Sequence, residues 1–137
     1  MAGGVRLLAK ARMALEVKVY LIVCLVLLFG CADNQPVVGP YPTQGKASWY
    51  TARRTASGEK FNQWGFTCAI RKFDFGKYYR VCNVANNKCV VVRHNDFGPA
   101  KRLYLGGRII DLSKSAFFGI ADLKKGIIEV TVHEVGD

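Results

Sequence analysis

The segment from Ile127 to Val135 alternates apolar and polar side chains between Ile128 and His133, and this pattern constrains the fold more than any other feature of the sequence. One face would carry Ile128, Val130 and Val132, and the other Glu129, Thr131 and His133. A period of two is typical of a half-buried β-strand. A strand that buries one face needs neighbouring strands, so the sequence predicts a mainly β fold.

Five more segments are typical of short strands, because their apolar or β-branched residues are bounded by turn residues. They span residues 47–51, 66–70, 78–82, 88–93 and 108–111. Residues 113–120 are typical of a short helix, with Ser113 in the N-cap position. About six short strands with one or two short helices favour a small closed barrel, since closure removes the exposed edges of such a sheet.

The start of the chain has the features of an export signal. Residues 20–29 carry no charge, and four lysines and arginines lie upstream of them. A basic region followed by an apolar run is typical of a signal peptide, whereas a membrane-spanning helix needs about 20 apolar residues. Residues 1–30 are therefore predicted to be a signal peptide, and Met13 is an alternative start.

The sequence Leu28-Phe29-Gly30-Cys31 resembles a bacterial lipobox, in which the cysteine becomes the lipid-modified first residue of the mature protein. Lipid on Cys31 would anchor an exported protein to a bacterial membrane in the cell envelope. The alternative is ordinary signal cleavage nearby, with Cys31 incidental. Residues 31–45 include three prolines and are predicted to be a flexible spacer before a domain at 46–137.

The remaining cysteines agree with export. Cys82 and Cys89 flank a predicted four-residue hairpin loop at 84–87, whose asparagines tolerate positive φ. Such a hairpin would place Cys82 opposite Cys89, and a disulfide there suits an oxidising compartment. Cys68 would be a small buried side chain or a free thiol. Without CxxC spacing or a neighbouring histidine, no zinc or other metal site is expected.

The charge of the chain bears on its partners. From Cys31 onward there are 16 lysines and arginines against 9 acidic residues, a net charge of +7. A basic surface suits an anionic partner, and an exported lipoprotein meets cell-wall polymers and anionic lipid first. No base-reading motif indicates nucleic acid. The basic residues are scattered among turns, so a solvated surface is the simpler alternative.

Two aspartates each follow a β-branched run. Asp96 comes shortly after Val90–Val92, and Asp111 directly follows Ile109-Ile110. Gly98-Pro99 makes the first position suitable for a turn, and the helix predicted after Asp111 makes the second suitable for a cap. Strand ends can also bring two carboxylates together in a closed barrel. The residues alone leave both interpretations open.

Four stretches together resemble one family. They are GKASWY, TASGEKF, FGKYYRVCNVANNKCVVVRHNDFGP and GRIIDLSKSAF, and they are similar to the rare lipoprotein A (RlpA) family of septal-ring lytic transglycosylases. The resemblance implies a six-stranded double-psi β-barrel and cleavage of the β-1,4 bond between N-acetylmuramic acid and N-acetylglucosamine in peptidoglycan. The sugar's own C6 hydroxyl attacks C1 to give a 1,6-anhydro end, so a single carboxylic acid suffices. The implied partners are glycan strands and division-site proteins, and no cofactor is implied.

The resemblance also suggests which residues form the site. Asp111 is the predicted proton donor, because double-psi barrel relatives keep a functional aspartate at the matching strand end. Asp96 would be a second carboxylate that supports Asp111 or orients substrate. Glu59 matches a family position tied to activity. Trp49 and Tyr50 are candidates for stacking on sugar, and strand alternation allows only one of them to reach the site. The remaining substrate-binding candidates are Arg93, His94 and Arg108.

The sequence departs from the family pattern at four positions. Ile70 replaces a histidine, Asn62 an aspartate, Phe97 an arginine and Asn87 a glycine. The first two family positions have been implicated in activity, and His94 could compensate for the missing histidine. These differences favour the alternative of an expansin-like lipoprotein that binds cell-wall glycan without cleaving it. A purely structural lipoprotein of the division site is a third hypothesis.

Overall fold

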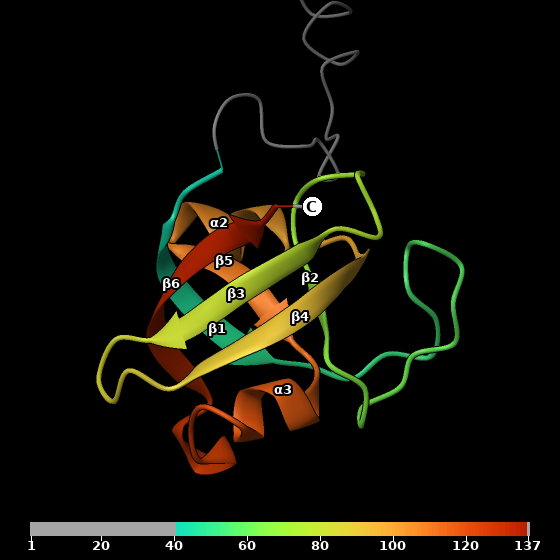
Figure 1. The fold of residues 1–137 in the computed structure, drawn as a ribbon. Helices are drawn as coiled ribbons and strands as arrows, with labels where there is room; N and C mark the ends of the chain where they lie inside the picture. The colour runs from blue at the N-terminus through green and yellow to red at the C-terminus, as the bar shows by residue number, and fades with distance from the viewer. Residues whose placement is uncertain (1–40, 137) are drawn as a thin grey trace, which may run out of the picture. The chain divides into compact units, whose positions relative to one another are not determined.

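The computed structural model describes residues 41–136, which form a closed six-stranded barrel (Figure 1). The strands are β1 (Gln44–Trp49), β2 (Thr67–Ala69), β3 (Tyr78–Asn83), β4 (Cys89–Asp96), β5 (Arg108–Leu112) and β6 (Ile127–Val135). Around the barrel they follow the order β1-β5-β2-β4-β3-β6. The mainly β barrel predicted from the short strands is confirmed.

Two of the six strand pairs in the barrel are parallel. β1 pairs with β5 and β2 pairs with β4 in the parallel sense, whereas the other four pairs are antiparallel. β1 and β2 are not neighbours in the barrel, and neither are β4 and β5. Long connections therefore precede β2 and β5, at residues 50–66 and 97–107. These connections carry several of the candidate site residues.

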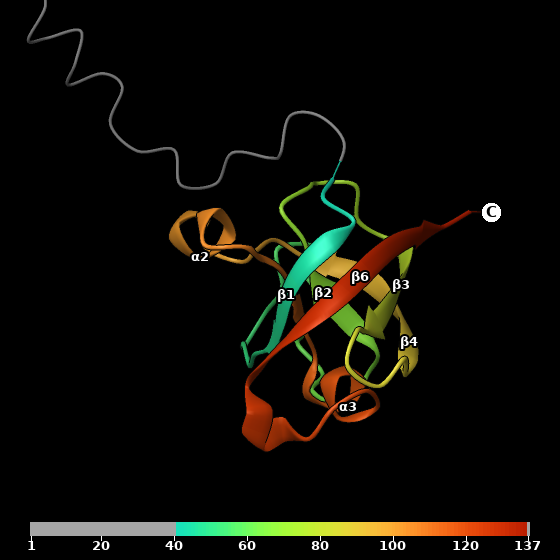
Figure 2. The same ribbon diagram turned by 90° about the vertical axis from the view of Figure 1, so that its left-hand side faces the viewer.

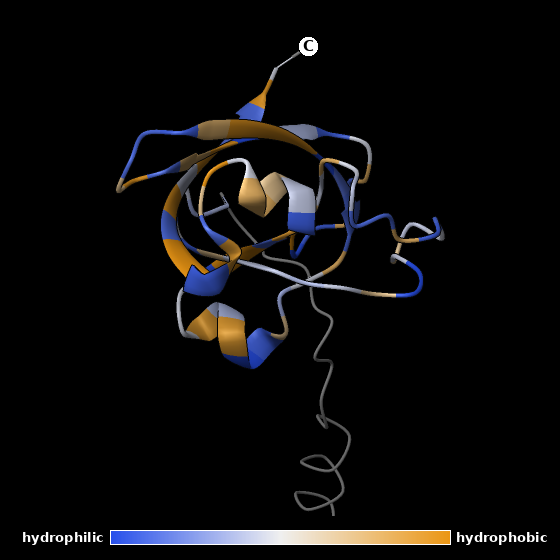
Figure 3. Cartoon of the chain, turned by 90° about the horizontal axis from the view of Figure 1, so that it is seen from below, coloured by the Kyte–Doolittle hydropathy of each residue, from blue (hydrophilic) through white to orange (hydrophobic). Residues whose placement is uncertain are grey.

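β6 shows the alternation that the sequence predicts. Ile128, Val130 and Val132 are buried, whereas Glu129 and His133 are exposed. The strand pairs with β1 on one side and β3 on the other. In the end-on view of Figure 3 the strands form a ring along which apolar and polar residues alternate. The apolar side chains meet inside the ring and form one continuous core.

The hairpin of β3 and β4 also matches its prediction. Cys82 lies opposite Cys89 in the register and the two form a disulfide. Asn87 in the connecting loop has a φ of 58°, in the left-handed region that asparagine tolerates. Cys68 is a fully buried free cysteine, which agrees with both descriptions predicted for it.

Two short helices lie at opposite ends of the barrel (Figure 2): α2 (Lys101–Leu105) and α3 (Lys114–Phe118). A 3-10 turn, η1 (Leu123–Lys125), precedes β6. Ser113 occupies the N-cap position of α3 as predicted, but its side chain does not cap the helix. Its hydroxyl instead donates to the backbone oxygen of Gly65 and accepts from the N–H of Thr67. Ser113 therefore holds the segment before β2.

The start of the folded domain is set by β1, which begins at Gln44. Tyr41 already packs against the core, and its hydroxyl donates to the backbone oxygen of Ile109. The predicted signal peptide, Cys31 and the first part of the spacer lie outside the described residues. Within residues 41–136, both helices are far too short to cross a membrane.

Candidate active site

The register of four neighbouring strands places the two predicted aspartates in one row. Ser48 of β1 pairs with Asp111 of β5, Asp111 pairs with Ala69 of β2, and Ala69 pairs with Asp96 of β4. Neighbouring strands lie about 4.8 Å apart, so the Cα atoms of the aspartates are about 10 Å apart. Paired residues point to the same side of a sheet, so the side chains of the two acids lie on either side of that of Ala69. Asp96 and Asp111 therefore form one cluster rather than two unrelated turns.

Asp111 accepts hydrogen bonds from the described residues through only one of its two carboxylate oxygens. Its side chain is 10% exposed, and Oδ1 accepts hydrogen bonds of 2.7 Å from both the Ser48 hydroxyl and Nε of Arg108. Within residues 41–136 no group donates to Oδ2. A methyl group on Gly98 would lie 3.9 Å from Oδ2, so the glycine leaves space beside this oxygen. Oδ2 is therefore the atom of Asp111 that can meet a substrate.

Asp96 is bound through both of its oxygens. Oδ1 accepts 2.8 Å hydrogen bonds from the N–H groups of Ala56 and Phe97, and Oδ2 accepts one of 2.8 Å from the Tyr50 hydroxyl. Burial, together with the neighbouring Asp96 carboxylate, raises the pKa of Tyr50. Its hydroxyl therefore remains a proton-bearing donor. Asp96 ties the connection after β1 to the end of β4, so it has the structural role of a turn residue as well.

Residues 53–61 fold back on themselves and carry Glu59. Arg54 and Lys60 form an antiparallel bridge, and the N–H of Thr55 donates to the oxygen of Glu59 at 2.9 Å. The N–H of Ser57 donates to the oxygen of Asn95 at 3.2 Å, which fixes this loop beside the end of β4. We call residues 53–61 the Glu59 loop.

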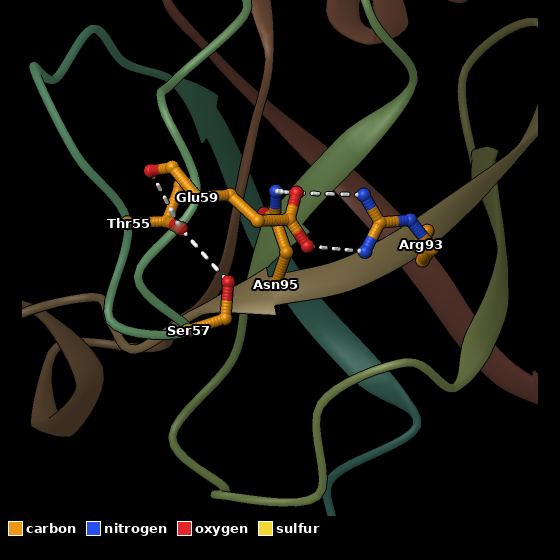
Figure 4. Close-up of polar contacts among 5 residues, drawn as sticks. All are labelled: Thr55, Ser57, Glu59, Arg93 and Asn95. Carbon is orange, nitrogen blue, oxygen red and sulfur yellow. Dashed lines mark hydrogen bonds and ion pairs between the residues drawn. The ribbon is translucent and has the colours of Figure 1, made fainter.

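The Glu59 carboxylate faces two side chains of β4 (Figure 4). Nη1 and Nη2 of Arg93 each donate to it at 2.8 Å, and Nδ2 of Asn95 donates at 3.1 Å. These hydrogen bonds, with that of Arg93 the larger cause, lower the pKa of Glu59 to about 2. Glu59 therefore positions Arg93 and Asn95, and the catalytic role suggested for it stays a prediction.

A pocket of about 350 Å³ lies against this cluster. Its polar wall includes Glu59, Arg93 and Asn95, and its apolar wall includes Phe66 and Tyr78, both about half exposed. Asn62 also lines it. Polar groups beside exposed aromatic rings are the combination that fixes the orientation of a small ligand.

Two predicted substrate-binding side chains do not face a substrate. His94 has no exposed surface, and its Nε2 lies 3.0 Å from the backbone oxygen of Asp96. The prediction for His94 is therefore wrong. The last three residues of β4 are all buried, so period-two alternation fails there. Trp49 packs against the core and its Nε1 donates to the oxygen of Leu123, which leaves Tyr50 as the aromatic residue beside the aspartates.

The positions where the sequence departs from the family pattern differ in environment. Ile70 is fully buried, and its backbone N–H donates to the oxygen of Asp96 at 3.1 Å. Its side chain fills the core rather than the space in front of the acids. Asn62 is exposed beside the Glu59 pocket, and its Oδ1 accepts from the N–H of Trp64.

Two residues of the site were not identified from the sequence. Ser48 holds Asp111, and Asn95 holds Glu59. Ser48 lies within the GKASWY stretch and could have been found from the pairing of β1 with β5, but that pairing needs the barrel topology. In the described part of the chain, no group of three or more His, Cys, Asp or Glu side chains is placed to hold a metal ion.

Comparison with known sequences identifies relatives of this barrel. Residues 42–132 match the model of a family described as lytic transglycolase. A probable endolytic peptidoglycan transglycosylase RlpA of Synechocystis is 45% identical over 95 residues, which cover 66% of this chain and 28% of that protein. The endolytic peptidoglycan transglycosylase RlpA of Neisseria meningitidis is 35% identical over 102 residues, which cover 72% of this chain and 41% of that protein. The chain thus matches less than half the length of either relative.

Solved structures share the fold. An expansin of Clavibacter michiganensis in complex with cellohexaose superposes with a TM-score of 0.53 at 19% identity, covering 69% of this chain and 50% of the expansin. A Streptomyces papain inhibitor superposes with a TM-score of 0.52 at 24% identity, covering 68% of this chain and 96% of the inhibitor. At these identities the likeness establishes the double-psi barrel alone, because one fold carries many functions.

Proposed function

Because the chain belongs to the RlpA family of lytic transglycolases, we propose that it is an endolytic peptidoglycan lytic transglycosylase. It cleaves the β-1,4 bond between N-acetylmuramic acid and N-acetylglucosamine and leaves 1,6-anhydro ends. The observation that carries this proposal is the register row, in which Asp111 and Asp96 flank Ala69 and Oδ2 of Asp111 stays open beside Gly98.

Asp111 is the proposed acid and base. Its protonated carboxyl gives the proton on Oδ2 to the glycosidic oxygen as the bond from that oxygen to C1 breaks. The C6 hydroxyl of the same sugar then attacks C1, and its proton returns to Asp111. One carboxyl performs both transfers, so no second catalytic carboxylate is needed. Ser48 and Arg108 hold Oδ1 and thereby aim Oδ2.

The other site residues position the glycan. Asp96, which accepts a hydrogen bond from Tyr50, lies at the end of the row away from β1, and its carboxylate would face the positive charge that develops on the sugar ring. The pocket beside Glu59 accepts a neighbouring sugar, with Phe66 and Tyr78 against its apolar face and Arg93 and Asn95 against its hydroxyls.

The second candidate is an expansin-like lipoprotein that binds glycan without cleaving it. Asp96 favours this alternative, because both of its oxygens already accept hydrogen bonds from the protein. Asn62 adds to it, since an amide stands beside the pocket where the family pattern has an acid. In this alternative Asp111 only hydrogen-bonds the sugar.

The products formed from purified glycan strands separate the two candidates. We expect mass spectrometry to find new 1,6-anhydro ends with the wild-type chain, and a drop of about 10²–10⁴-fold in their rate of formation with Asp111→Asn, the effect typical of removing a general acid. Asp122→Asn is the matched control, because Asp122 is an exposed aspartate that only caps η1. Glycan binding without new ends would contradict the enzyme and support the expansin-like protein.

The location of the protein is a separate proposal that rests on residues 1–31. The apolar run and Cys31 support export and lipid anchoring in a bacterial cell envelope, where division-site proteins would be neighbours. Labelled palmitate should be incorporated into the wild-type chain and not into Cys31→Ala. Equal labelling of both would exclude Cys31 as the anchor.

A further inference from the structure

The Glu59 loop borders a second hollow that the proposed reaction does not use. Its volume is about 700 Å³, and its walls are Ala52, Arg53, Arg54, Lys60 and Phe61. We call it the basic hollow. The three cationic residues are exposed, so their charged groups are accessible from solvent.

The positive charges of the basic hollow have no acidic counterpart in the fold. Within residues 41–136, no carboxylate forms an ion pair with Arg53, Arg54 or Lys60. Glu59 is the one acidic residue between positions 51 and 66, and Arg93 and Asn95 already bind it. Three positive charges therefore gather at one place without neutralisation.

The backbone of the loop pairs two of these cationic residues, and Nη1 of Arg54 donates to the backbone oxygen of Gly58 at 3.0 Å. Arg54 and Lys60 are directly paired in the antiparallel bridge, and like charges in such a pair destabilise it. Backbone hydrogen bonds from Thr55 to Glu59 and from Phe61 to Arg53 keep the loop in this shape, as does the bond from Ala56 to Asp96. A bound anion would offset the repulsion and would meet a loop that is already ordered.

The chemistry of the walls indicates what kind of anion fits. The guanidinium groups of Arg53 and Arg54 can grip a carboxylate or a phosphate through two parallel hydrogen bonds. Phe61 packs on Tyr50 with ring centroids 4.9 Å apart and offers an apolar surface for a sugar ring. A volume of about 700 Å³ lies in the range of small-ligand pockets. We propose that the basic hollow binds a sugar unit that carries an oxyanion.

The source of that sugar unit rests on the proposed function, which places the protein on the cell wall. Either a carboxylate-bearing sugar of a glycan or a sugar phosphate of an anionic wall polymer supplies the required chemistry. Tyr50 packs on Phe61 of the basic hollow and donates to Asp96 of the catalytic row. An anionic unit held in the hollow would therefore be linked to the catalytic row through Tyr50. The hollow would then select which stretch of polymer is presented to the enzyme.

Three soluble probes test the inference with the full chain. They are trigalacturonate, which carries carboxylates, a short poly(ribitol phosphate), and neutral chitotriose. We expect one or both anionic probes to bind at least about tenfold more tightly than chitotriose at low salt, with the difference shrinking as salt screens the charges. The anion that binds more tightly identifies the source. Equal binding of all three probes would overturn the inference.

A charge-matched pair of variants locates the binding. Arg53→Gln, Arg54→Gln and Lys60→Gln together should weaken binding of the anionic probe by about tenfold or more, because three positive charges are lost at one site. Lys101→Gln, Arg102→Gln and Lys124→Gln together remove the same charge from exposed positions on α2 and η1 and should leave binding within about twofold. Equal weakening by both triple variants would show that net charge alone attracts the probes and would contradict a site.

This inference and the proposed function fail in different ways. Asp111→Asn should lower the rate of cleavage by about 10²–10⁴-fold and leave binding of the anionic probe unchanged, because Asp111 does not line the basic hollow. Weaker binding in an Arg53→Gln and Arg54→Gln double variant, which leaves Lys60 of the Glu59 pocket in place, with cleavage of glycan retained would support the hollow as a separate subsite. A chain that never forms 1,6-anhydro ends but binds the anionic probe through these residues would refute the enzyme and keep the subsite.

Discussion

The carboxylates of Asp96 and Asp111 are held by the protein in a different way from the carboxylate of Glu59. Asp96 and Asp111 are buried and lie on strands; backbone N–H groups of Ala56 and Phe97 donate to Asp96, and the Ser48 hydroxyl and Arg108 donate to Asp111. Glu59 lies on a loop with its side chain 42% exposed, and its main donor is the flexible side chain of Arg93. An exposed ion pair contributes little to stability, whereas donors left unpaired in a buried site are costly. The aspartates should therefore contribute strongly to the stability of the fold, whereas Glu59 should contribute little.

The largest expected effect is the loss of stability when the buried carboxylate of Asp96 is removed. Asp96→Ala leaves the N–H groups of Ala56 and Phe97 and the Tyr50 hydroxyl without their acceptor. We expect the free energy of unfolding to fall by about 2–4 kcal/mol. Glu59→Ala should lower it by less than about 1 kcal/mol, because its ion pair is exposed to solvent. Urea unfolding followed by circular dichroism measures both.

Asp96→Asn is the control for the size of the side chain, since its amide oxygen can still accept one or two of these hydrogen bonds. It should lie between wild type and Asp96→Ala. If the Asp96→Ala and Glu59→Ala variants were equally stable, the inference that Asp96 contributes more than Glu59 to the stability of the fold would be wrong.

The buried row was the more predictable half of the site. Asp96 and Asp111 stand out in the sequence because each follows a β-branched run, and the alternation in β6 together with the short strands predicts a closed barrel. Ser48 was not predictable in the same way, because its contact with Asp111 joins residues 63 positions apart. Pairing of β1 with β5 brings them together, and no local pattern in either strand encodes that pairing.

Local patterns failed for identifiable physical reasons elsewhere. Its closeness to Asp96 in the sequence suggests His94 as a substrate-binding residue, but the end of β4 buries three residues in succession. The helix α2 spans five residues, has no buried side chain and begins after Ala100, which has no side chain that could cap it. The Glu59 contact with Arg93 depends on how a loop folds back, and loops lack the periodicity that reveals strands.

A smaller effect should separate positioning from proton transfer within the row. Ser48→Ala removes one of the two donors to Oδ1 of Asp111. We expect the rate of formation of 1,6-anhydro ends to fall by about tenfold, less than the about 10²–10⁴-fold expected when the acid itself is lost. The KM for glycan should change little, and Ser48→Thr, which keeps the hydroxyl, should restore most of the rate. A loss as large as that of Asp111→Asn would mean that Ser48 itself takes part in the chemistry.

The burial of His94, which precedes the row residue Asp96 on β4, should also make the fold sensitive to mild acid. Burial lowers the pKa of His94, against the opposing effect of the nearby Asp74 carboxylate. The unfolded chain binds a proton below its ordinary pKa of about 6.5 while the folded chain resists it, so stability should decrease as the pH falls below that value. The urea midpoint measured between pH 8 and pH 5 should therefore drop in wild type and in His133→Gln, whose imidazole is exposed, but stay flatter in His94→Gln.

The smallest effect belongs to the exposed cluster and appears in a different pH range. Hydrogen bonds from Arg93 and Asn95 lower the pKa of Glu59 from 4.5 to about 2, so the stabilisation they provide is present above about pH 4.5 and is lost as the pH falls towards 2. Because the Glu59 side chain is 42% exposed, solvent screening should keep this contribution below about 1 kcal/mol. Glu59→Gln should flatten the stability curve between pH 4.5 and pH 2 and leave the His94 range untouched. If the stability of Glu59→Gln differed from wild type in its pH dependence above pH 5, Glu59 would be coupled to the buried residues of the site. The contrast between the two clusters would then be wrong.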